Sequence, residues 1–382
     1  MLAVLKRTKV IIWDEVPIQH KYAIDAADQS LRDLLKKPDA PFGGITVVFG
    51  GDFQQTLPVV LRGSRQQIIA ASFVQGNLWH YVKVFYLKQN MQLDRTSDSD
   101  RHAAWLLKIG ARISPGDEKV VEIPEAICCP DNTLESLIAS TYSDISGIDN
   151  IGDQYFLDRT ILSAKNDDVD KINDAILDQI NPDQEKHVML SADSVDLDNN
   201  IVKNQVYPIE FLNSLKASGL SLSKLIFKTG CPVMLLWNLE PSRGLCNRSH
   251  LILMDVHHHV LKCKLITGDA RFAEETVLIP RISLKPSSES LPIPLKPRQF
   301  PVCLAFAITI NKSQGQGVRN VGLDLRTPVF SHGQLYVALL RCTSGEQIKV
   351  LLAEDVEDRK MLNIVYKEVL EVCYCEYKLY FV

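Results

Sequence analysis

Three stretches of the sequence place groups that can act on phosphates directly after apolar runs. Asp14-Glu15 follow the run Val10–Trp13, and Asp52, with the amides Gln54 and Gln55 beyond it, follows Ile45–Phe49 and two glycines. Near the other end, the stretch Asn311-Lys312-Ser313-Gln314-Gly315 follows a third apolar run. Carboxylates hold Mg²⁺ and polarise water, while amides, hydroxyls and glycine-rich backbone contact phosphate oxygens. The pattern predicts a site for nucleotide chemistry.

Each stretch also has a simpler interpretation. Strands often end in acidic residues, and Asp52 with its two glutamines could only cap a loop. The loop after Asn311 could be a solvated strand-to-helix turn. Arg341, which follows Gly333–Leu340, could stabilise charge in phosphoryl transfer, or it could only cap carbonyls at a helix end.

The elements that position these groups follow from the apolar pattern. Short β-rich runs and helical spacing alternate, with strands predicted at residues 9–16, 45–49, 82–87 and 161–163 and helices at 22–37, 102–109, 167–180 and 333–340. The first of these runs, KVIIWDEV, is predicted to be a buried parallel strand, covered on both faces. Strands that alternate with helices and end in polar residues indicate an α/β layer with its ligands at the carboxyl edge. From about Leu225 to Pro301, short β-rich runs broken by Gly, Pro and Asp indicate a small antiparallel barrel. The run Cys303–Ile310 then returns as a buried strand.

Composition fits an ordinary globular protein of two or three domains, with 382 residues, 46% hydrophobic and 23% charged. The formal net charge is −4, but residues 94–198 hold 9 Lys/Arg against 23 Asp/Glu, so the remainder carries +10. A basic surface is what a nucleic-acid backbone requires. The nine cysteines lack zinc-site or disulfide spacing and indicate reduced thiols, and no signal peptide or membrane span is predicted.

Taken together, the motifs resemble the PIF-type (petite integration frequency) DNA helicases of superfamily one, in the form carried by Helitron transposons. IIWDEV is similar to helicase motif II and VVFGGDFQQTLPVV to motif III. Later motifs of the family are similar, in the right order, to LSAKNDDVDKIN, PVMLLWNLEPSRGLCN, AFAITINKSQGQG and GQLYVALLRCTS. The resemblance runs from about Lys9 to Leu352.

The resemblance implies an α/β fold with two RecA-like domains of P-loop NTPase type that close on ATP. We expect a truncated first domain at 1–82, a second at 83–355 with an SH3-like β-barrel insert at about 225–300, and a C-terminal extension at 356–382. The implied activity is ATP-dependent 5′-to-3′ unwinding of DNA, with single strands and duplex junctions as partners and roles in DNA repair, recombination and telomere maintenance. The implied location is intracellular and nuclear.

The resemblance also assigns roles to residues. Catalytic roles fall to Glu15, which would activate water, to Gln55, which would sense the γ-phosphate, and to Arg341 as an arginine finger. Asp14 would hold Mg²⁺. The nucleotide would be bound by Asp14, Asp52, Gln314 and Gly315, and the DNA backbone by Asn311, Lys312 and Ser313.

The sequence departs from the family at several cationic positions. No G-x-x-x-x-G-K-[ST] occurs in the 382 residues, so the loop that cradles the ATP phosphates is missing. Gln54 stands where the family has arginine, as does Gln92 after Asn90-Met91. We therefore expect impaired ATP turnover, and a non-catalytic remnant that binds single-stranded DNA weakly or not at all is the competing hypothesis. A regulatory subunit that uses the acidic residues 94–198 is a third.

Overall fold

The computed structural model describes residues 2–87, 97–111, 119–143, 145, 152–195, 223–267, 275–283 and 295–373. The chain forms two compact units. The first comprises Met1–Thr133, Ser313–Arg319 and Leu323–Val382, and the second comprises Leu134–Lys312 and Asn320–Gly322. The functional domain boundaries expected at residues 82 and 355 stay a prediction.

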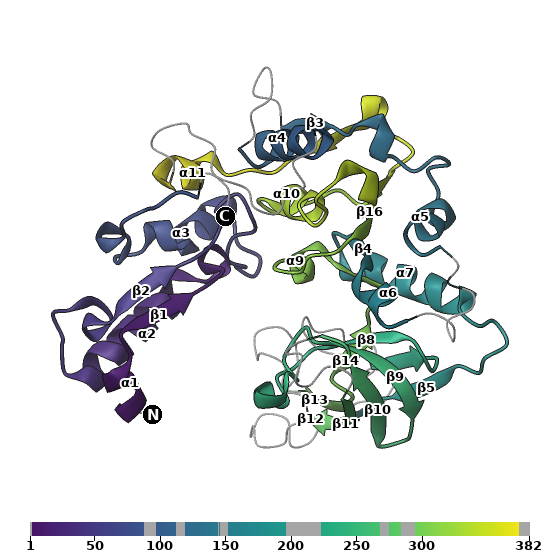
Figure 1. Ribbon diagram of the computed structural model, residues 1–382, viewed down its shortest axis with the longest axis horizontal. Helices are drawn as coiled ribbons and strands as arrows, with labels where there is room; N and C mark the ends of the chain where they lie inside the picture. Colours follow the sequence, from purple (N-terminus) through teal and green to yellow (C-terminus); the bar gives the residue numbers. More distant parts are fainter. Residues whose placement is uncertain are drawn as a thin grey trace. The chain divides into compact units, whose positions relative to one another are not determined.

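The first unit contains a parallel pair of strands with helices before, between and after them (Figure 1). Its elements are α1 (Leu2–Arg7), β1 (Val10–Trp13), η1 (Val16–Ile18), α2 (Lys21–Leu35), η2 (Pro41–Gly44), β2 (Thr46–Phe49), α3 (Arg65–Ala71), η3 (Phe73–Gln75), η4 (Trp79–Tyr81), α4 (Ser97–Ala111), β3 (Val120–Glu122), η6 (Glu125–Ile127), α10 (Gln334–Leu339), η9 (Gly345–Gln347), β17 (Ile348–Leu352), η10 (Glu357–Arg359), β18 (Lys360–Leu362) and α11 (Lys367–Cys373).

Strands β1 and β2 have one packed face and one exposed face. Trp13, Val47 and Phe49 pack against a core that includes Ile24 of α2 and Phe73. On the other face, the exposed fraction of Ile12 is 80%. The parallel pairing is as predicted, but the prediction of a strand buried on both sides is wrong for β1.

Helix α2 forms where the helical spacing predicts it. The ring of His20 accepts a hydrogen bond from the Tyr22 amide at 3.2 Å and so caps the first turn. Lys36 ends the helix in the left-handed conformation. The buried Asp28 accepts a hydrogen bond from the Phe42 amide at 2.5 Å and forms an ion pair with Arg32. These contacts position the segment around Phe42, which leads into β2.

The second unit holds an α/β part and a β-rich part. Its elements are α5 (Leu134–Thr141), α6 (Gln154–Leu157), β4 (Arg159–Ser163), α7 (Asn166–Gln179), β5 (His187–Leu190), β6 (Ala192–Val195), β7 (Lys224–Phe227), β8 (Pro232–Leu235), η8 (Pro241–Arg243), β9 (His250–Val256), β10 (Val260–Leu265), β11 (Thr276–Pro280), β12 (Ile282–Ser283), β13 (Leu295–Gln299), β14 (Val302–Leu304) and β15 (Ala307–Thr309). Helix α9 (Ile310–Ser313) and strand β16 (Asn320–Leu325) cross from one unit to the other.

In the α/β part, β4 and β15 pair in parallel and α7 packs on both. Asn173 of α7 is buried and exchanges two hydrogen bonds with the backbone of Ala307, at 2.9 and 3.0 Å. The strand and helix predicted at residues 161–163 and 167–180 are therefore present.

The β-rich part is antiparallel, as predicted, and larger than predicted. One sheet has the strand order β11-β10-β9-β8-β14, a second has β12-β13-β6, and β5 pairs with β7 (Figure 1). Because β5 and β6 take part, the region begins at His187 rather than near residue 225. Alternate residues of β10 and β11 are buried, as expected for strands with one face on a core.

Two strand predictions are wrong. Residues 82–87 form neither helix nor strand, and no strand in the described part of the chain pairs with them, so the apolar side chain of Phe85 stays 77% exposed. The run Cys303–Ile310 is not one strand. It divides at Ala305-Phe306, where the chain passes from β14, paired with β8, to β15, paired with β4.

Among the helices that the structure describes, none combines the length and apolar composition needed to cross a bilayer. Within those same residues, no group of three or more His, Cys, Asp or Glu side chains could hold a metal ion. The cysteines that the structure covers are free thiols, as expected from their spacing.

Candidate active site

The site is built where β1 and β2 end. Trp13 pairs with Phe49, so the two strands stop at the same level. The charge of Glu15, just after β1, is close enough to raise the pKa of Asp52, which follows β2. The Gly50 amide donates to the Trp13 carbonyl at 2.9 Å, and the Val16 amide donates to the Gly50 carbonyl at 3.0 Å. The carboxyl edge expected for these strands therefore exists in the first unit.

The two glycines allow this close approach. A Cβ atom at Gly50 would lie 2.7 Å from Asp14 Oδ1, and one at Gly51 would lie 2.2 Å from Pro17 Cδ. Any side chain at either position would push the Asp14-Glu15 turn away from β2.

Glu15 has an unusual backbone conformation. Its φ is 53°, in the left-handed region, and its amide donates to Asp14 Oδ1 at 2.9 Å. This conformation costs a non-glycine residue about 1–2 kcal/mol. Strain of this kind collects at functional sites, because the surrounding structure must impose it.

A chain of hydrogen bonds joins Glu15 to residues far away in the sequence. Gln314 Nε2 donates to Glu15 Oε2 at 2.9 Å, and the buried Thr56 hydroxyl donates to Gln314 Oε1. A Cβ atom at Gly315, whose φ is 81°, would lie 3.8 Å from Glu15 Oε1. The structure thus brings together Glu15, Gln314 and Gly315, which the sequence analysis assigned to one site.

Arg341 holds the loop that carries Gln314. Its Nη1 donates to the carbonyls of Ser313 at 3.1 Å and Gln316 at 3.0 Å, while Nε donates to Val337 at 3.0 Å. Burial lowers the pKa of Arg341, and the nearby Glu15 carboxylate counteracts part of that shift. In this structure the guanidinium caps carbonyls, the simpler of the two roles that the sequence left open.

Asp52 is a carboxylate in a poorly hydrated position. Its Oδ1 accepts a hydrogen bond from the Gln54 amide at 2.9 Å. Burial raises the pKa of Asp52 to about 6, against hydrogen bonds from the Gln54 backbone and from the Tyr336 and Gln55 side chains that lower it, and the Glu15 charge adds to the rise. Such shifts are frequent where carboxylates have a chemical role.

Gln55 and Gln54 point to different surroundings. Among the described residues, Gln55 Oε1 is buried with no hydrogen-bond partner, an unusual state for an amide oxygen. Gln54 is buried as well, with its Oε1 next to Gly110 of α4, where a Cβ atom would come within 2.8 Å of it. The position that resembles a family arginine is therefore packed against a helix.

The remaining predicted residues lie around this cluster or in the other unit. Asp14 is exposed beside Glu15, and Ser313 is fully buried at the start of the Arg341-bound loop. Asn311 and Lys312 belong to the second unit and are half-buried in α9. Gln92 lies outside the described residues.

Three residues in contact with the cluster were not singled out from the sequence. Thr56 directly follows Gln55, Tyr336 lies within the run GQLYVALLR, and His332 directly precedes that run. Their places inside or beside quoted motifs are the signal that could have found them.

Comparisons with known proteins agree with the motifs. The family model described as PIF1-like helicase matches residues 1–116, and the model of the DNA helicase Pif1 2B domain matches residues 210–256. The chain is 26% identical over 351 residues to the ATP-dependent DNA helicase PIF1 of Xenopus laevis, an alignment that covers 90% of this chain and 46% of the relative. It is 27% identical over 404 residues to the ATP-dependent DNA helicase Pif1 of a Psychrobacter species, covering 93% and 55%. The chain spans about half the length of the curated relatives it matches.

Solved structures show the same fold. A Pif1 helicase from Bacteroides in complex with ADP-AlF3 and single-stranded DNA superposes with a TM-score of 0.65 at 21% identity, covering 97% of this chain and 76% of that chain. The Pif1 helicase of Candida albicans gives 0.60 at 21% identity, with 97% and 77% covered. The α/β fold with two RecA-like domains is therefore confirmed. From these sequence matches, the chain is similar to the PIF-type helicases of superfamily one.

Proposed function

We propose that this protein is an ATP-dependent 5′-to-3′ DNA helicase and that the cluster around Glu15 is its nucleotide-hydrolysis site. The observation that carries the proposal is the hydrogen-bond chain from Thr56 through Gln314 to the Glu15 carboxylate, on a loop held by Arg341. It joins residues 299 positions apart in sequence, each of which resembles a motif residue of the family.

Glu15 is the base that orients the attacking water, because its carboxylate is fixed by Gln314 and by a strained backbone. Gln55 contacts the γ-phosphate through its amide nitrogen, which can donate to a phosphate oxygen and already lies at the Asp52 carboxylate. Asp52 and Gly315 line the same cluster. Arg341 supplies positive charge that stabilises the phosphates during transfer. For that role its guanidinium gives up a hydrogen bond to a loop carbonyl and donates instead to a phosphate oxygen, which is a stronger acceptor.

Mg²⁺ fits the donors beside Glu15. It is usually held by one or two carboxylates, phosphate oxygens and several waters. Asp14 is exposed, and its Oδ1 accepts the Glu15 amide, which orients the carboxylate at the strand end. Bound there, the ion would neutralise charge on the phosphates. Asn311, Lys312 and Ser313 would lie near the DNA backbone in this proposal.

We also propose that the 382 residues by themselves turn over ATP poorly. The cradle of backbone amides and the lysine of G-x-x-x-x-G-K-[ST] do not occur in them, so positioning and charge stabilisation of the phosphates are both incomplete.

A strand-displacement assay tests the helicase proposal. The chain is fused behind the G-x-x-x-x-G-K-[ST]-bearing segment of the Bacteroides relative, and duplexes with a 5′ or a 3′ single-stranded tail are offered with ATP. We expect displacement from the 5′-tailed duplex and none from the 3′-tailed duplex or from the Glu15→Gln fusion. A fusion that hydrolyses ATP and separates neither duplex would refute the proposed activity.

A second candidate function is a non-catalytic protein that binds single-stranded DNA. One observation favours it: the charge of +10 carried by the chain outside residues 94–198. The salt dependence of DNA binding, treated in the Discussion, tests it.

A further inference from the structure

His332 is a buried side chain that binds two segments of the first unit at once. It is 1% exposed, and its Nδ1 accepts a hydrogen bond from the Tyr366 amide at 2.7 Å. An amide can only donate, so Nδ1 carries no proton and the ring is the Nε2–H tautomer. Nε2 then donates to the Phe53 carbonyl at 2.9 Å.

At the next residue, Gly333, the backbone contacts the loop that carries Gln55. A Cβ atom at Gly333 would lie 2.3 Å from the Gln54 carbonyl oxygen and 2.6 Å from the Gln55 carbonyl carbon. The Gly333 amide donates to the Ile364 carbonyl at 3.0 Å. His332-Gly333 therefore lie between the loop Phe53–Thr56 and the segment near Ile364.

The segment Asn363–Cys373, which includes α11, is firmly packed in this unit. Tyr366, Val369 and Cys373 form a core cluster with Leu57 and Val74. Arg65 of α3 pairs with Glu368 at 2.6 Å and stacks over the Tyr366 ring at 4.6 Å. Asn363 Nδ2 donates to the Ile109 carbonyl at 2.8 Å.

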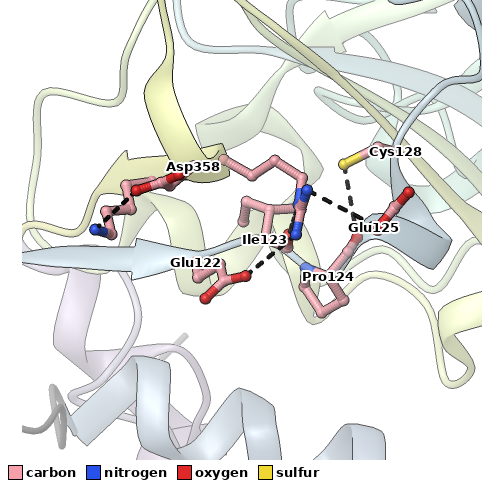
Figure 2. Close-up of polar contacts among 8 residues, drawn as sticks. Glu122, Ile123, Pro124, Glu125, Cys128 and Asp358 are labelled. Atoms are coloured by element: carbon pink, nitrogen blue, oxygen red, sulfur yellow. Dashed lines mark hydrogen bonds and ion pairs between the residues drawn. The ribbon is translucent and has the colours of Figure 1, made fainter.

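A second anchorage lies just before this segment. Strand β18 pairs with β3, and the Arg359 guanidinium donates to the Ile123 carbonyl at 3.2 Å and pairs with Glu122 at 3.3 Å (Figure 2). Arg359 Nη1 also lies 3.9 Å from Glu125 Oε2. The residues that precede Asn363 are therefore held in place by β3 and its flanking side chains.

We propose that His332 is a positioning residue that couples the segment Asn363–Cys373 to the loop Phe53–Thr56 and thereby holds Gln55 in place. The functional meaning of this coupling rests on the proposed hydrolysis site, but the coupling itself does not. Gln54 and Gln55 follow the carbonyl that His332 binds, so loss of that hydrogen bond frees the backbone that carries them. The segment would then act on the site without touching nucleotide.

Hydrogen exchange of the Gln54 and Gln55 amides in the full chain tests the coupling. His332→Leu keeps an apolar side chain of similar bulk but removes both hydrogen bonds, and we expect exchange about 10-fold faster, since a tenfold change corresponds to about 1.4 kcal/mol. His332→Gln can donate to Phe53 and accept from Tyr366, and we expect it to restore exchange to within about threefold of wild type.

The matched control is Asn173→Ala, which also removes a buried side chain with two backbone hydrogen bonds, but in the second unit. It should lower the melting temperature and leave the exchange of Gln54 and Gln55 unchanged. Equal exchange in His332→Leu and wild type, equal acceleration by the control, or no rescue by glutamine would overturn the proposal. If the leucine variant does not fold, a folded glutamine variant supports the proposal and an unfolded one overturns it. None of these readouts uses ATP, so a failure of the hydrolysis site is recognised separately.

Discussion

At Asp52, the free energy of folding that the site sacrifices can be measured. Burial holds its pKa at about 6, above the ordinary value of 3.8. An acid with a raised pKa favours the folded state at low pH, and that contribution is lost as pH rises through 6. At neutral pH the folded protein therefore carries a partly buried charge that the unfolded chain would hydrate fully.

Asp52→Asn should stabilise the protein at pH 7.5. Asparagine cannot ionise, yet its Oδ1 can still accept the Gln54 amide, so the gain in unfolding free energy should be about 3 kcal/mol. The gain should shrink toward zero as pH approaches 4. Melting temperatures of both proteins at pH 7.5 and 4.5 check this, and a difference of the same size at both pH values would show that the charge of Asp52 is not the cause.

The residue types of the site could be predicted from the sequence, but their contacts could not. Asp14, Glu15 and Asp52 follow strands whose parallel pairing places them together, which a strand-helix-strand pattern implies. The bond from Gln314 to Glu15 depends on how two distant loops pack, and nothing local in either loop specifies it. His332 was missed for the same reason, because its partners are backbone groups of Phe53 and Tyr366.

At the scale of elements, the backbone amides of β1 should be less protected from hydrogen exchange than those of β15. Val10–Trp13 have one exposed face, whereas Ala307–Thr309 are buried and tied to α7 through Asn173. In native-state hydrogen exchange, we expect the amides of Val10–Trp13 to open at lower free energy than those of Ala307–Thr309. Equal protection of both strands in a monomeric sample would mean that further contacts cover β1.

Elements with a clear period were predicted well, and those defined by long-range pairing were not. Helices α2, α4 and α7 lie where apolar residues recur at helical spacing. Residues 82–87 have a strand-like composition but no partner strand among the described residues, and a strand exists only as part of a ladder. The division of Cys303–Ile310 between two sheets is likewise invisible in a continuous apolar run.

At the scale of the whole molecule, charge is unevenly distributed along the chain. If the basic part of the sequence binds a DNA backbone, affinity for single strands should fall linearly with the logarithm of salt concentration, with a slope of about −0.7 per phosphate neutralised. Fluorescence anisotropy with a poly-dT oligonucleotide measures this slope. No salt-dependent binding at low ionic strength would refute both the DNA-bound helicase and the single-strand binder for these 382 residues.

Lys312→Ala should weaken this binding and flatten the slope by about one contact. Lys171→Ala is the matched control, because it removes the same charge from an exposed lysine within the acidic residues 94–198. The control should leave the slope unchanged. Equal effects of the two substitutions would point to net charge rather than to a contact at Lys312.

Phosphate release from ATP, measured with saturating single-stranded DNA, tests the hydrolysis site most directly. The 382 residues alone should release phosphate no faster than their Glu15→Gln variant. The chain fused behind the phosphate-binding segment of the Bacteroides relative should release it with DNA stimulation, and Glu15→Gln or Arg341→Ala should slow that release, the latter by about 10³-fold or more, as for other arginine fingers. Turnover by the 382 residues clearly above the Glu15→Gln variant, or turnover by the fusion that neither substitution slows, would contradict this assignment of the site.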